Sequence, residues 1–209
     1  MFTGLIEHVG VIAALDAIDS GFRLVVEADS AGELKPGDSI AVNGVCLTVV
    51  RQSARDFVTE VGPETARVTT LGGFAAGTLV NLERPMRPDS RMGGHFVLGH
   101  VDATGVLTEI TPDGEFFWIR VSFDPALAPY FIPKGSVAVD GISLTVASLH
   151  ERDFTVQIIP FTMEHTNLRG ARAGDRVNIE VDVIGKYVVR VAQLSGSLPG
   201  VPLLPPAAS

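Results

Sequence analysis

The sequence is poor in the residues that build disulfides and membrane spans. Cys46 is the only cysteine among 209 residues, which excludes an internal disulfide and any paired-cysteine metal motif. No hydrophobic run reaches the ~20 residues that a membrane-spanning helix needs. The opening residues MFTGLIEHVG contain neither the basic segment nor the long apolar segment of a signal peptide. These absences predict a cytoplasmic protein with no membrane contact.

Positive charge is also scarce. Lys and Arg number 16 against 24 Asp and Glu, a net charge of −8 without any basic tract, so nucleic acid is not an expected partner. The stretch MGGHFVLG lacks both the G-x-G-x-x-G spacing and the terminal Gly-Lys-Ser/Thr of a phosphate loop. His95 and His100 are five positions apart on an expected extended segment. Their side chains would point to opposite faces, which argues against a zinc site.

What the sequence does contain is a long internal repeat. VNGVCLTVV at 42–50 recurs as VDGISLTVA at 139–147, an offset of 97 positions. The same offset aligns residues 55–57 (Arg-Asp-Phe) with 152–154, and an offset of 95 aligns the segment around Gly4 with that around Gly99. Such a period is too long for a solenoid unit and predicts a tandem duplication of a small domain.

Each copy is rich in short segments of β-branched and apolar residues between turn signals. The first copy contains FRLVVE, SIAV, CLTVV, FVTEV and LVNLE, and its Asn-Gly dipeptide becomes Asp-Gly in the second. A short helix is expected after Pro63 and again after Pro160. About six strands in ~90 residues favour a small closed barrel over an open sheet. We therefore predict an all-β chain of two homologous six-stranded barrels.

The ends of the copies suggest four parts. We expect a first barrel with its linker at 1–94, a second barrel at 95–182, a helix at 183–194 and a disordered, proline-rich tail at 195–209. Asp182 could cap that helix, which has no counterpart in the first copy. Apolar residues follow it at helical spacing: Ile184, Tyr187, Val188, Val191 and Leu194. Packing on its own barrel and oligomer formation both fit this pattern.

Positions where the copies differ in chemistry are candidates for divided roles. Five differences occur inside matching stretches: Cys46 against Ser143, Leu5 against His100, Gly37 against Lys134, 62–64 against 159–161, and Pro85 against Asp182. Each also has a purely structural explanation, such as a buried thiol, a turn histidine, a solvated lysine or a helix cap. A triad of Ser143, His100 and Asp182 can be written, but no G-x-S-x-G motif supports it.

Five phrases in order resemble the riboflavin synthase family: MFTGLIE, NGVCLTV, GGHFVLGHVD, KGSVAVDGISLTV and IPFTMEHTNL. The resemblance covers residues 1–194. It implies two Greek-key barrels, a C-terminal α-helix and a homotrimer built around those helices. It also implies dismutation of two 6,7-dimethyl-8-ribityllumazine molecules by four-carbon transfer, giving riboflavin and a ribitylamino-pyrimidinedione. No metal or organic cofactor is implied, and association with lumazine synthase is left open. One departure is Leu98, where the resemblance leads us to expect a polar residue.

The resemblance also implies two pockets, one for each substrate molecule. The first would contain Gly4, Leu5, Ile6, Cys46, Leu47, Thr48, Glu60, Val61, Gly62, Pro63, Glu64 and Thr65. The second would contain Gly99, His100, Val101, Lys134, Ser143, Leu144, Thr145, Gln157, Ile158, Ile159, Pro160, Phe161 and Thr162. In the family, the first barrel of one subunit faces the second barrel of a neighbour, and the two ligands stack between them.

The chemistry needs a base, a nucleophile or activated water, and alignment of two rings. Cys46 is the candidate nucleophile or hydrogen-bonding group, and His100 is the candidate for proton transfer because histidine titrates near neutral pH. Ser143, Thr145 and Asp182 are expected to position substrate or water. The hydroxyl-rich ribityl chain could bind Thr48, Thr145, Glu64 and Thr65.

Two other classes of protein compete with this interpretation. A non-catalytic lumazine- or flavin-binding antenna protein could use the same double barrel, but it would not need Cys46, His100, Ser143 and Asp182 together. A flavin reductase would need a nicotinamide-binding α/β domain, and no βαβ pattern is visible. The sequence therefore favours the enzyme.

Overall fold

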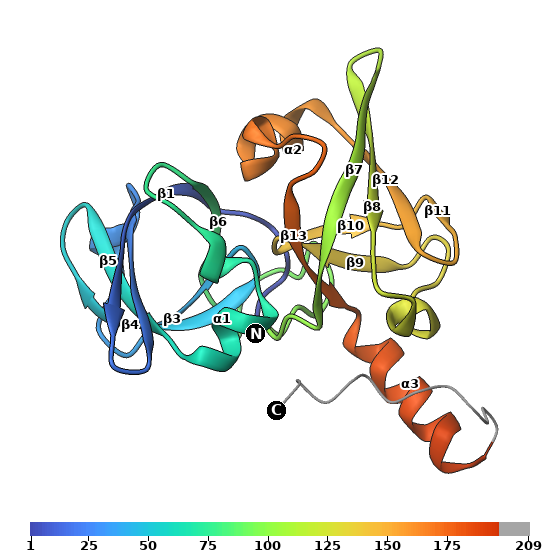
Figure 1. The fold of residues 1–209 in the computed structure, drawn as a ribbon, viewed down its shortest axis with the longest axis horizontal. Coiled ribbons are helices and arrows are strands. Elements are labelled where there is room, and N and C mark those ends of the chain that lie inside the picture. The colour runs from blue at the N-terminus through green and yellow to red at the C-terminus, as the bar shows by residue number, and fades with distance from the viewer. Residues whose placement is uncertain (197–209) are drawn as a thin grey trace.

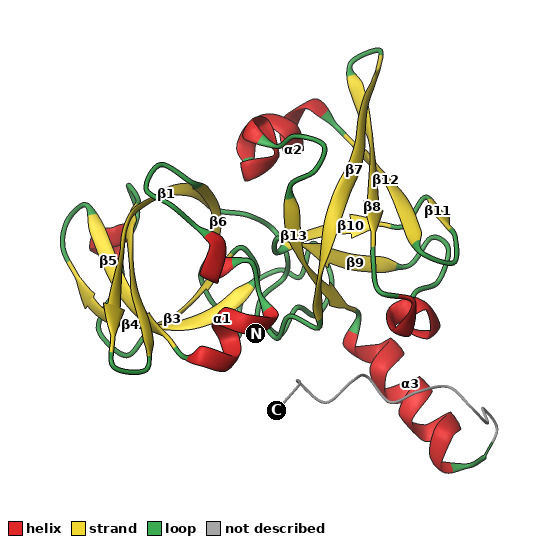
Figure 2. Ribbon diagram, in the orientation of Figure 1, coloured by secondary structure: helices red, strands yellow, loops and turns green. Residues whose placement is uncertain are grey.

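The chain forms two β-barrels side by side, and a helix leads away from the second (Figures 1 and 2). The computed structural model describes residues 1–196. The first barrel is closed, with strand order β1-β2-β5-β4-β3-β6. Its strands are β1 His8–Ile18, β2 Gly21–Glu27, β3 Ser39–Val42, β4 Val45–Gln52, β5 Asp56–Val61 and β6 Leu79–Glu83. All the pairings are antiparallel, as short strands joined by tight turns require.

The second barrel repeats this order with one strand broken in two. Its sheet runs β10-β9-β13-β7-β8-β12-β11. The strands are β7 Ala103–Asp113, β8 Phe116–Ser122, β9 Ser136–Val139, β10 Ile142–Thr145, β11 Ser148–Leu149, β12 Asp153–Ile158 and β13 Arg176–Val181. Together β10 and β11 match β4, and the Ala147 amide between them still donates to the Thr155 carbonyl of β12 at 2.8 Å. The predicted all-β fold with a C-terminal helix is confirmed, and the first repeat is the closed six-stranded barrel that was expected. The second repeat differs, because its sheet has seven strands and its end strands β10 and β11 do not pair, so this barrel is not closed by a continuous ladder.

Short helices close the barrels at equivalent places. α1 (Pro63–Val68) and α2 (Pro160–His165) each begin at a proline, which has no amide hydrogen to leave unpaired at a helix start. The 3-10 helices are η1 Ala31–Glu33, η2 Leu71–Gly73, η3 Pro125–Tyr130 and η4 Asn167–Gly170. Each barrel has its own apolar core, and that of the second contains a cluster of three aromatic rings: Phe123, Phe131 and Phe154.

An approximate twofold axis relates the barrels, and equivalent residues meet on it. Phe2 pairs with Val97, its own counterpart, through amide-to-carbonyl bonds of 2.7 and 3.2 Å. Gly44 and Gly141 also meet: a Cβ on Gly44 would lie 2.7 Å from the Gly141 nitrogen. Both turns have positive φ angles of 74° and 79°, so glycine is required there for conformation and for space. The duplicated Asn-Gly and Asp-Gly turns thus form the junction between the barrels.

Buried polar groups hold this junction, and one of them breaks its symmetry. The Asn81 side chain donates to the Asp140 carbonyl at 2.9 Å, and the Asn178 side chain donates to the Asn43 carbonyl at 2.8 Å. Asn43 and Asp140 are equivalent positions, yet only the second is an acid. The Asp140 carboxylate accepts from the Asn178 amide and from the Asn167 side chain, both at 2.8 Å. Burial raises the pKa of the Asp140 carboxyl from 3.8 to about 7.

Asp140→Asn is therefore expected to change how stability depends on pH. A carboxyl with a raised folded-state pKa stabilises the fold below its unfolded pKa, and this contribution is lost as pH rises through about 7. As pH rises from about 5 to about 8, the free energy of unfolding of Asp140→Asn should increase relative to that of the wild type by roughly 1 kcal/mol or more. The loss of an acceptor for the Asn167 side chain adds a cost that does not change with pH. Denaturant titrations measure this difference. The matched variant Asn43→Asp should show the opposite trend, and identical pH profiles for all three proteins would contradict the assignment.

The C-terminal helix α3 (Val183–Leu194) is attached along one side only. Asp182 caps it by accepting from the Ile184 amide at 2.9 Å, Lys186 forms an ion pair with Asp102 at 2.7 Å, and Val189 is buried against the second barrel. An apolar stripe remains 57–71% exposed: Ile184, Tyr187, Val188, Val191 and Leu194. The helix therefore contacts its own barrel and still presents an uncovered apolar face.

The tail predicted at 195–209 lies outside the described residues except for Ser195 and Gly196. Within residues 1–196, none of the helices is long and apolar enough to cross a membrane.

Candidate active site

The N-terminal segment of each repeat lies against the barrel of the other repeat. The Gly4 carbonyl accepts a hydrogen bond from the Ser143 amide at 2.8 Å, and the Gly99 carbonyl accepts one from the Cys46 amide at 3.0 Å. Both glycines have positive φ angles, and a Cβ on either would lie 2.5–2.6 Å from the Cβ of its partner. Ile6 correspondingly packs on the core of the second barrel, and Val101 packs on the core of the first.

This arrangement corrects how the predicted pockets were divided. Residues 4–6 were expected beside Cys46, and residues 99–101 beside Ser143; the structure places them the other way round. The internal alignment shows which segments are equivalent, but equivalence does not say which barrel a segment contacts. We call the two resulting groups the Cys46 half-site, with residues 99–101, and the Ser143 half-site, with residues 4–6.

Cys46 and Thr48 lie on the same face of β4, because alternate strand residues share a face. Cys46 is half-buried, Thr48 is exposed, and Leu47 between them points into the barrel core. His100 is exposed, directly after the glycine that contacts Cys46. Strand β4 pairs with β5, and β5 ends at Val61, just before α1. The thiol and hydroxyl of β4 are therefore on the strand next to the one that leads to α1. This half-site therefore offers a thiol, a hydroxyl and an imidazole on one barrel.

The segment after β5 is polar and open. Gly62, Pro63 and Glu64 are exposed, and Glu64 forms an ion pair with Arg67 at 2.6 Å. Glu60 forms an exposed ion pair with Arg23 at 3.0 Å, while Val61 is buried in the core. Exposed pairs of this kind contribute little to stability, so both carboxylates are free to exchange partners with a ligand hydroxyl.

The Ser143 half-site contains a histidine that was not predicted there. The imidazole Nδ1 of His95 lies 2.7 Å from the Ser143 hydroxyl oxygen, and the His95 amide donates to the Thr3 carbonyl at 3.1 Å. His95 is buried, and its Nε2 has no hydrogen-bond partner among residues 1–196. Burial lowers the pKa of His95, although the charge of Asp182 opposes this. A neutral imidazole beside a serine hydroxyl can accept its proton.

The triad considered from sequence is therefore not the one assembled. The histidine that contacts Ser143 is His95 rather than His100, and the Asp182 carboxylate serves as the cap of α3. Asp182 still influences His95 electrostatically. Comparison of the two repeats did not single out His95, because it has no counterpart in the first repeat. At the preceding Gly94 a Cβ would lie 2.0 Å from the Thr3 carbonyl oxygen, so glycine is needed where this segment approaches the N-terminal segment.

Lys134 occupies an unusual backbone conformation. Its φ angle is +66°, and the equivalent Gly37 has φ +93°, so the turn favours glycine in both repeats. The Lys134 amide donates to the Val146 carbonyl at 2.8 Å, and its side chain is exposed. A lysine at such a glycine-type position costs of order 1 kcal/mol.

The segment after β12 is apolar where its counterpart is polar. Ile159 is 49% exposed and Phe161 is 65% exposed, whereas the first repeat has Gly62 and Glu64 at these positions. The Phe161 ring stacks on His165 at 4.0 Å between centroids. The remaining predicted residues are placed as follows: Gln157 and Thr145 are exposed, Leu144, Pro160 and Thr162 are half-buried, and Ile158 is in the core. The two half-sites thus share a framework and differ in chemistry.

A separate cleft opens between the barrels near the twofold axis, with a volume of about 620 Å³. Asn43, Thr70, Asp140 and Asn167 are among its lining residues, and none of the predicted site residues is. Among residues 1–196, no group of three or more His, Cys, Asp or Glu side chains is placed to hold a metal ion.

Comparison with known proteins agrees with this duplicated architecture. Residues 3–85 and 98–182 each match the lumazine binding domain, so the chain is a tandem pair of such domains. A riboflavin synthase from Actinobacillus pleuropneumoniae is 46% identical over 191 residues, covering 90% of this chain and 88% of the relative. One from Mycobacterium tuberculosis is 44% identical over 201 residues, covering 94% of this chain and all of the relative. The chain belongs to the riboflavin synthase family.

Solved structures show the same fold at lower sequence identity. LumP complexed with 6,7-dimethyl-8-(1'-D-ribityl) lumazine superposes with a TM-score of 0.79 at 21% identity, covering 87% of this chain and 99% of LumP. LumP complexed with riboflavin gives 0.80 at 23% identity, with the same coverage. At this identity the likeness concerns the fold alone.

Proposed function

We propose that this chain is a riboflavin synthase. It would convert two molecules of 6,7-dimethyl-8-ribityllumazine into riboflavin and 5-amino-6-(D-ribitylamino)uracil by transfer of a four-carbon unit. The observation that carries this proposal is the identity of 41–46% with relatives named riboflavin synthase over about nine-tenths of the chain. The atoms of the two substrate molecules are fully divided between the two products, so the overall reaction needs no external oxidant or reductant.

The unlike half-sites support this reaction. One substrate molecule gives carbon atoms and the other receives them, so two similar pockets with different polar groups suit the task. The Cys46 half-site offers a thiol and His100; the Ser143 half-site offers a hydroxyl and His95. We assign proton transfer to the histidines, attack on a ring or activation of water to Cys46, and substrate positioning to Ser143, Thr145 and Asp182. The exposed Lys134 ammonium is suited to donate a hydrogen bond to a carbonyl oxygen of the substrate ring.

We further propose that the active enzyme is a cytoplasmic homotrimer held by α3. The exposed apolar stripe of that helix supports self-association, and the single unpaired cysteine fits a reducing compartment. In such a trimer, the Cys46 half-site of one subunit would face the Ser143 half-site of its neighbour, and the two substrate rings would stack between them. Association with lumazine synthase stays a prediction.

A non-catalytic lumazine-binding protein is the second candidate, because LumP has the same fold. One experiment separates the two functions. The purified protein is mixed with 6,7-dimethyl-8-ribityllumazine, and riboflavin absorbance and fluorescence are followed. Riboflavin formation supports the enzyme, whereas tight binding of the lumazine without turnover supports the antenna protein.

Two ligand sites of unequal affinity are expected on each chain. The reason is that the apolar wall of Ile159 and Phe161 in one half-site is replaced by Gly62 and Glu64 in the other. Isothermal titration calorimetry with a non-reactive lumazine analogue measures both the stoichiometry and the affinities. A clean fit to one site per chain would contradict this expectation.

A further inference from the structure

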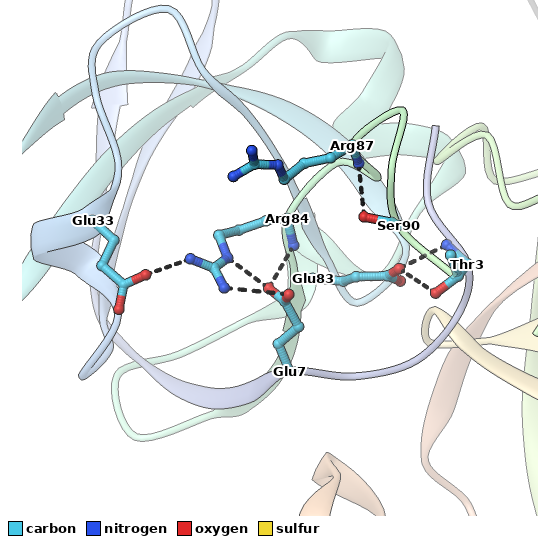
Figure 3. A network of polar contacts seen from close by, with 7 residues as sticks. All are labelled: Thr3, Glu7, Glu33, Glu83, Arg84, Arg87 and Ser90. Atoms are coloured by element: carbon cyan, nitrogen blue, oxygen red, sulfur yellow. Dashed lines mark hydrogen bonds and ion pairs between the residues drawn. The ribbon is translucent and has the colours of Figure 1, made fainter. Parts of the chain in front are cut away.

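Each repeat has a buried glutamate in the last two residues of its last strand. Glu83 ends β6 and is 5% exposed. Its Oε1 accepts from the Thr3 amide at 2.6 Å and from the Thr3 hydroxyl at 2.8 Å (Figure 3). Its Oε2 accepts from the Gly4 amide at 3.0 Å. All three donors belong to the segment that goes on to contact Ser143. Burial raises the pKa of Glu83, and these hydrogen bonds oppose the rise.

Glu180 is the equivalent residue on β13 and is 3% exposed. Its Oε1 accepts from the Leu98 amide at 2.7 Å, and its Oε2 accepts from the Gly99 and His100 amides, both at 3.0 Å. These donors belong to the segment that goes on to contact Cys46. Burial raises the pKa of Glu180 as well, and its bonds to the Leu98 and Gly99 amides oppose the rise.

Only a carboxylate satisfies these donors. Each glutamate offers two acceptor oxygens, and each oxygen receives at least one N–H. A glutamine would present an NH₂ group to one of the amides, leaving two donors face to face in a buried place. Burying a carboxylate costs free energy, and this cost is met only where its hydrogen bonds are complete. A buried, fully hydrogen-bonded carboxylate occurs in both repeats, and in each case it holds the segment that contacts the opposite barrel.

We propose that Glu83 and Glu180 are crossed positioning residues, each setting the geometry of the half-site on the barrel to which it does not belong. Glu83, on the first barrel, fixes the turn at Gly4 and thereby the Ser143 half-site. Glu180, on the second barrel, fixes the turn at Gly99 and thereby the Cys46 half-site. The inference rests on the proposed function for the identity of the ligand, although the crossed contacts do not depend on it.

The single cysteine provides a probe that reports one half-site at a time. The wild-type chain has its thiol in the Cys46 half-site, and the double variant Cys46→Ser/Ser143→Cys moves it to the other. Glu83→Gln and Glu180→Gln are made in both backgrounds. Alkylation by iodoacetamide is timed without ligand and with increasing non-reactive lumazine analogue, and thermal unfolding verifies that each variant is folded.

A crossed pattern is expected. Without ligand, Glu180→Gln should speed alkylation of Cys46 several-fold, because the Gly99 turn no longer covers it, while Glu83→Gln changes that rate less than twofold. With the analogue, Glu180→Gln should raise the concentration that half-protects Cys46 by about 10-fold. At position 143, Glu83→Gln should likewise speed ligand-free alkylation several-fold and raise the half-protecting analogue concentration by about 10-fold. Thr3→Ala, which removes only one donor to Glu83, keeps the test open if Glu83→Gln does not fold, and should give a smaller effect at position 143 alone.

If each variant changes the alkylation rates at positions 46 and 143 equally, the glutamates have a merely structural role. If each variant changes only the rate on its own barrel, the proposed connection is reversed. Either result overturns the inference. The ligand-free rates separate this test from the proposed function. If the wild type forms no riboflavin and the analogue protects neither thiol, the proposed function fails. The crossed pattern of ligand-free alkylation still decides the positioning role.

Discussion

Cys46→Ala and His100→Gln are each expected to lower kcat by about 10-fold or more while the barrels stay folded. General acid–base groups typically contribute ~10²–10⁴ in rate, and we take the low end because the two half-sites can share the work. Cys46 is half-buried and packs against a small cluster that includes Phe2 and Val97, and His100 is exposed, so neither side chain belongs to the core of either barrel. Steady-state kinetics of riboflavin formation measures the effect.

The duplication supplies matched controls for both substitutions. Cys46→Ser reproduces the residue that the second repeat has at the equivalent place, and His100→Leu reproduces Leu5. Both should fold normally, because the same framework already accepts these side chains. If the Cys46 thiol acts by hydrogen bonding, Cys46→Ser should retain more activity than Cys46→Ala. If the thiol is the nucleophile, the two variants should be equally impaired. Near-normal kcat in both Cys46→Ala and His100→Gln would show that they are structural residues.

Much of the fold follows from the repeat. Positions that match at the offset of 97 fall in equivalent strands, such as β3 with β9 and β5 with β12. The first strand of each barrel, β1 and β7, was not recognised. HVGVIAALDAI lacks a clear alternation, because a strand bent by a bulge between Ile12 and Ala14 does not keep one face to the core. The break between β10 and β11 was also invisible, since the first repeat has a continuous β4.

The candidate site was predicted less completely, for a physical reason. Each N-terminal segment could lie against its own barrel or against the other barrel. Because the repeats are homologous, both arrangements would bury the same residues and satisfy the same backbone amides. Sequence equivalence therefore identifies Gly4 and Gly99 as counterparts, but it does not say which barrel each one contacts, and the expected partners were exchanged. His95 was considered only as a metal ligand, because its counterpart in the first repeat would precede Met1.

Removing residues 183–209 is expected to abolish the assembly and most of the activity. The apolar stripe of α3 leaves five large side chains more than half exposed. Burying each side chain is worth about 1.5–3 kcal/mol, which is enough to sustain association after its entropic cost. If each active site needs half-sites from two subunits, the truncated chain keeps both half-sites but cannot bring two substrate rings together. Its activity should fall by about 100-fold or more, in line with the loss of substrate alignment.

The matched control removes only residues 197–209 and leaves α3 and both barrels intact. It should sediment as the trimer and retain full turnover, because every described contact survives. A second control, Val188→Asp, keeps the helix and its Lys186–Asp102 ion pair while placing a charge in the stripe. It should dissociate the trimer and lower activity in parallel with the longer truncation. Sedimentation velocity and a riboflavin assay on the same samples decide the matter. A fully active monomer would refute both the role of α3 in assembly and the sharing of sites between subunits.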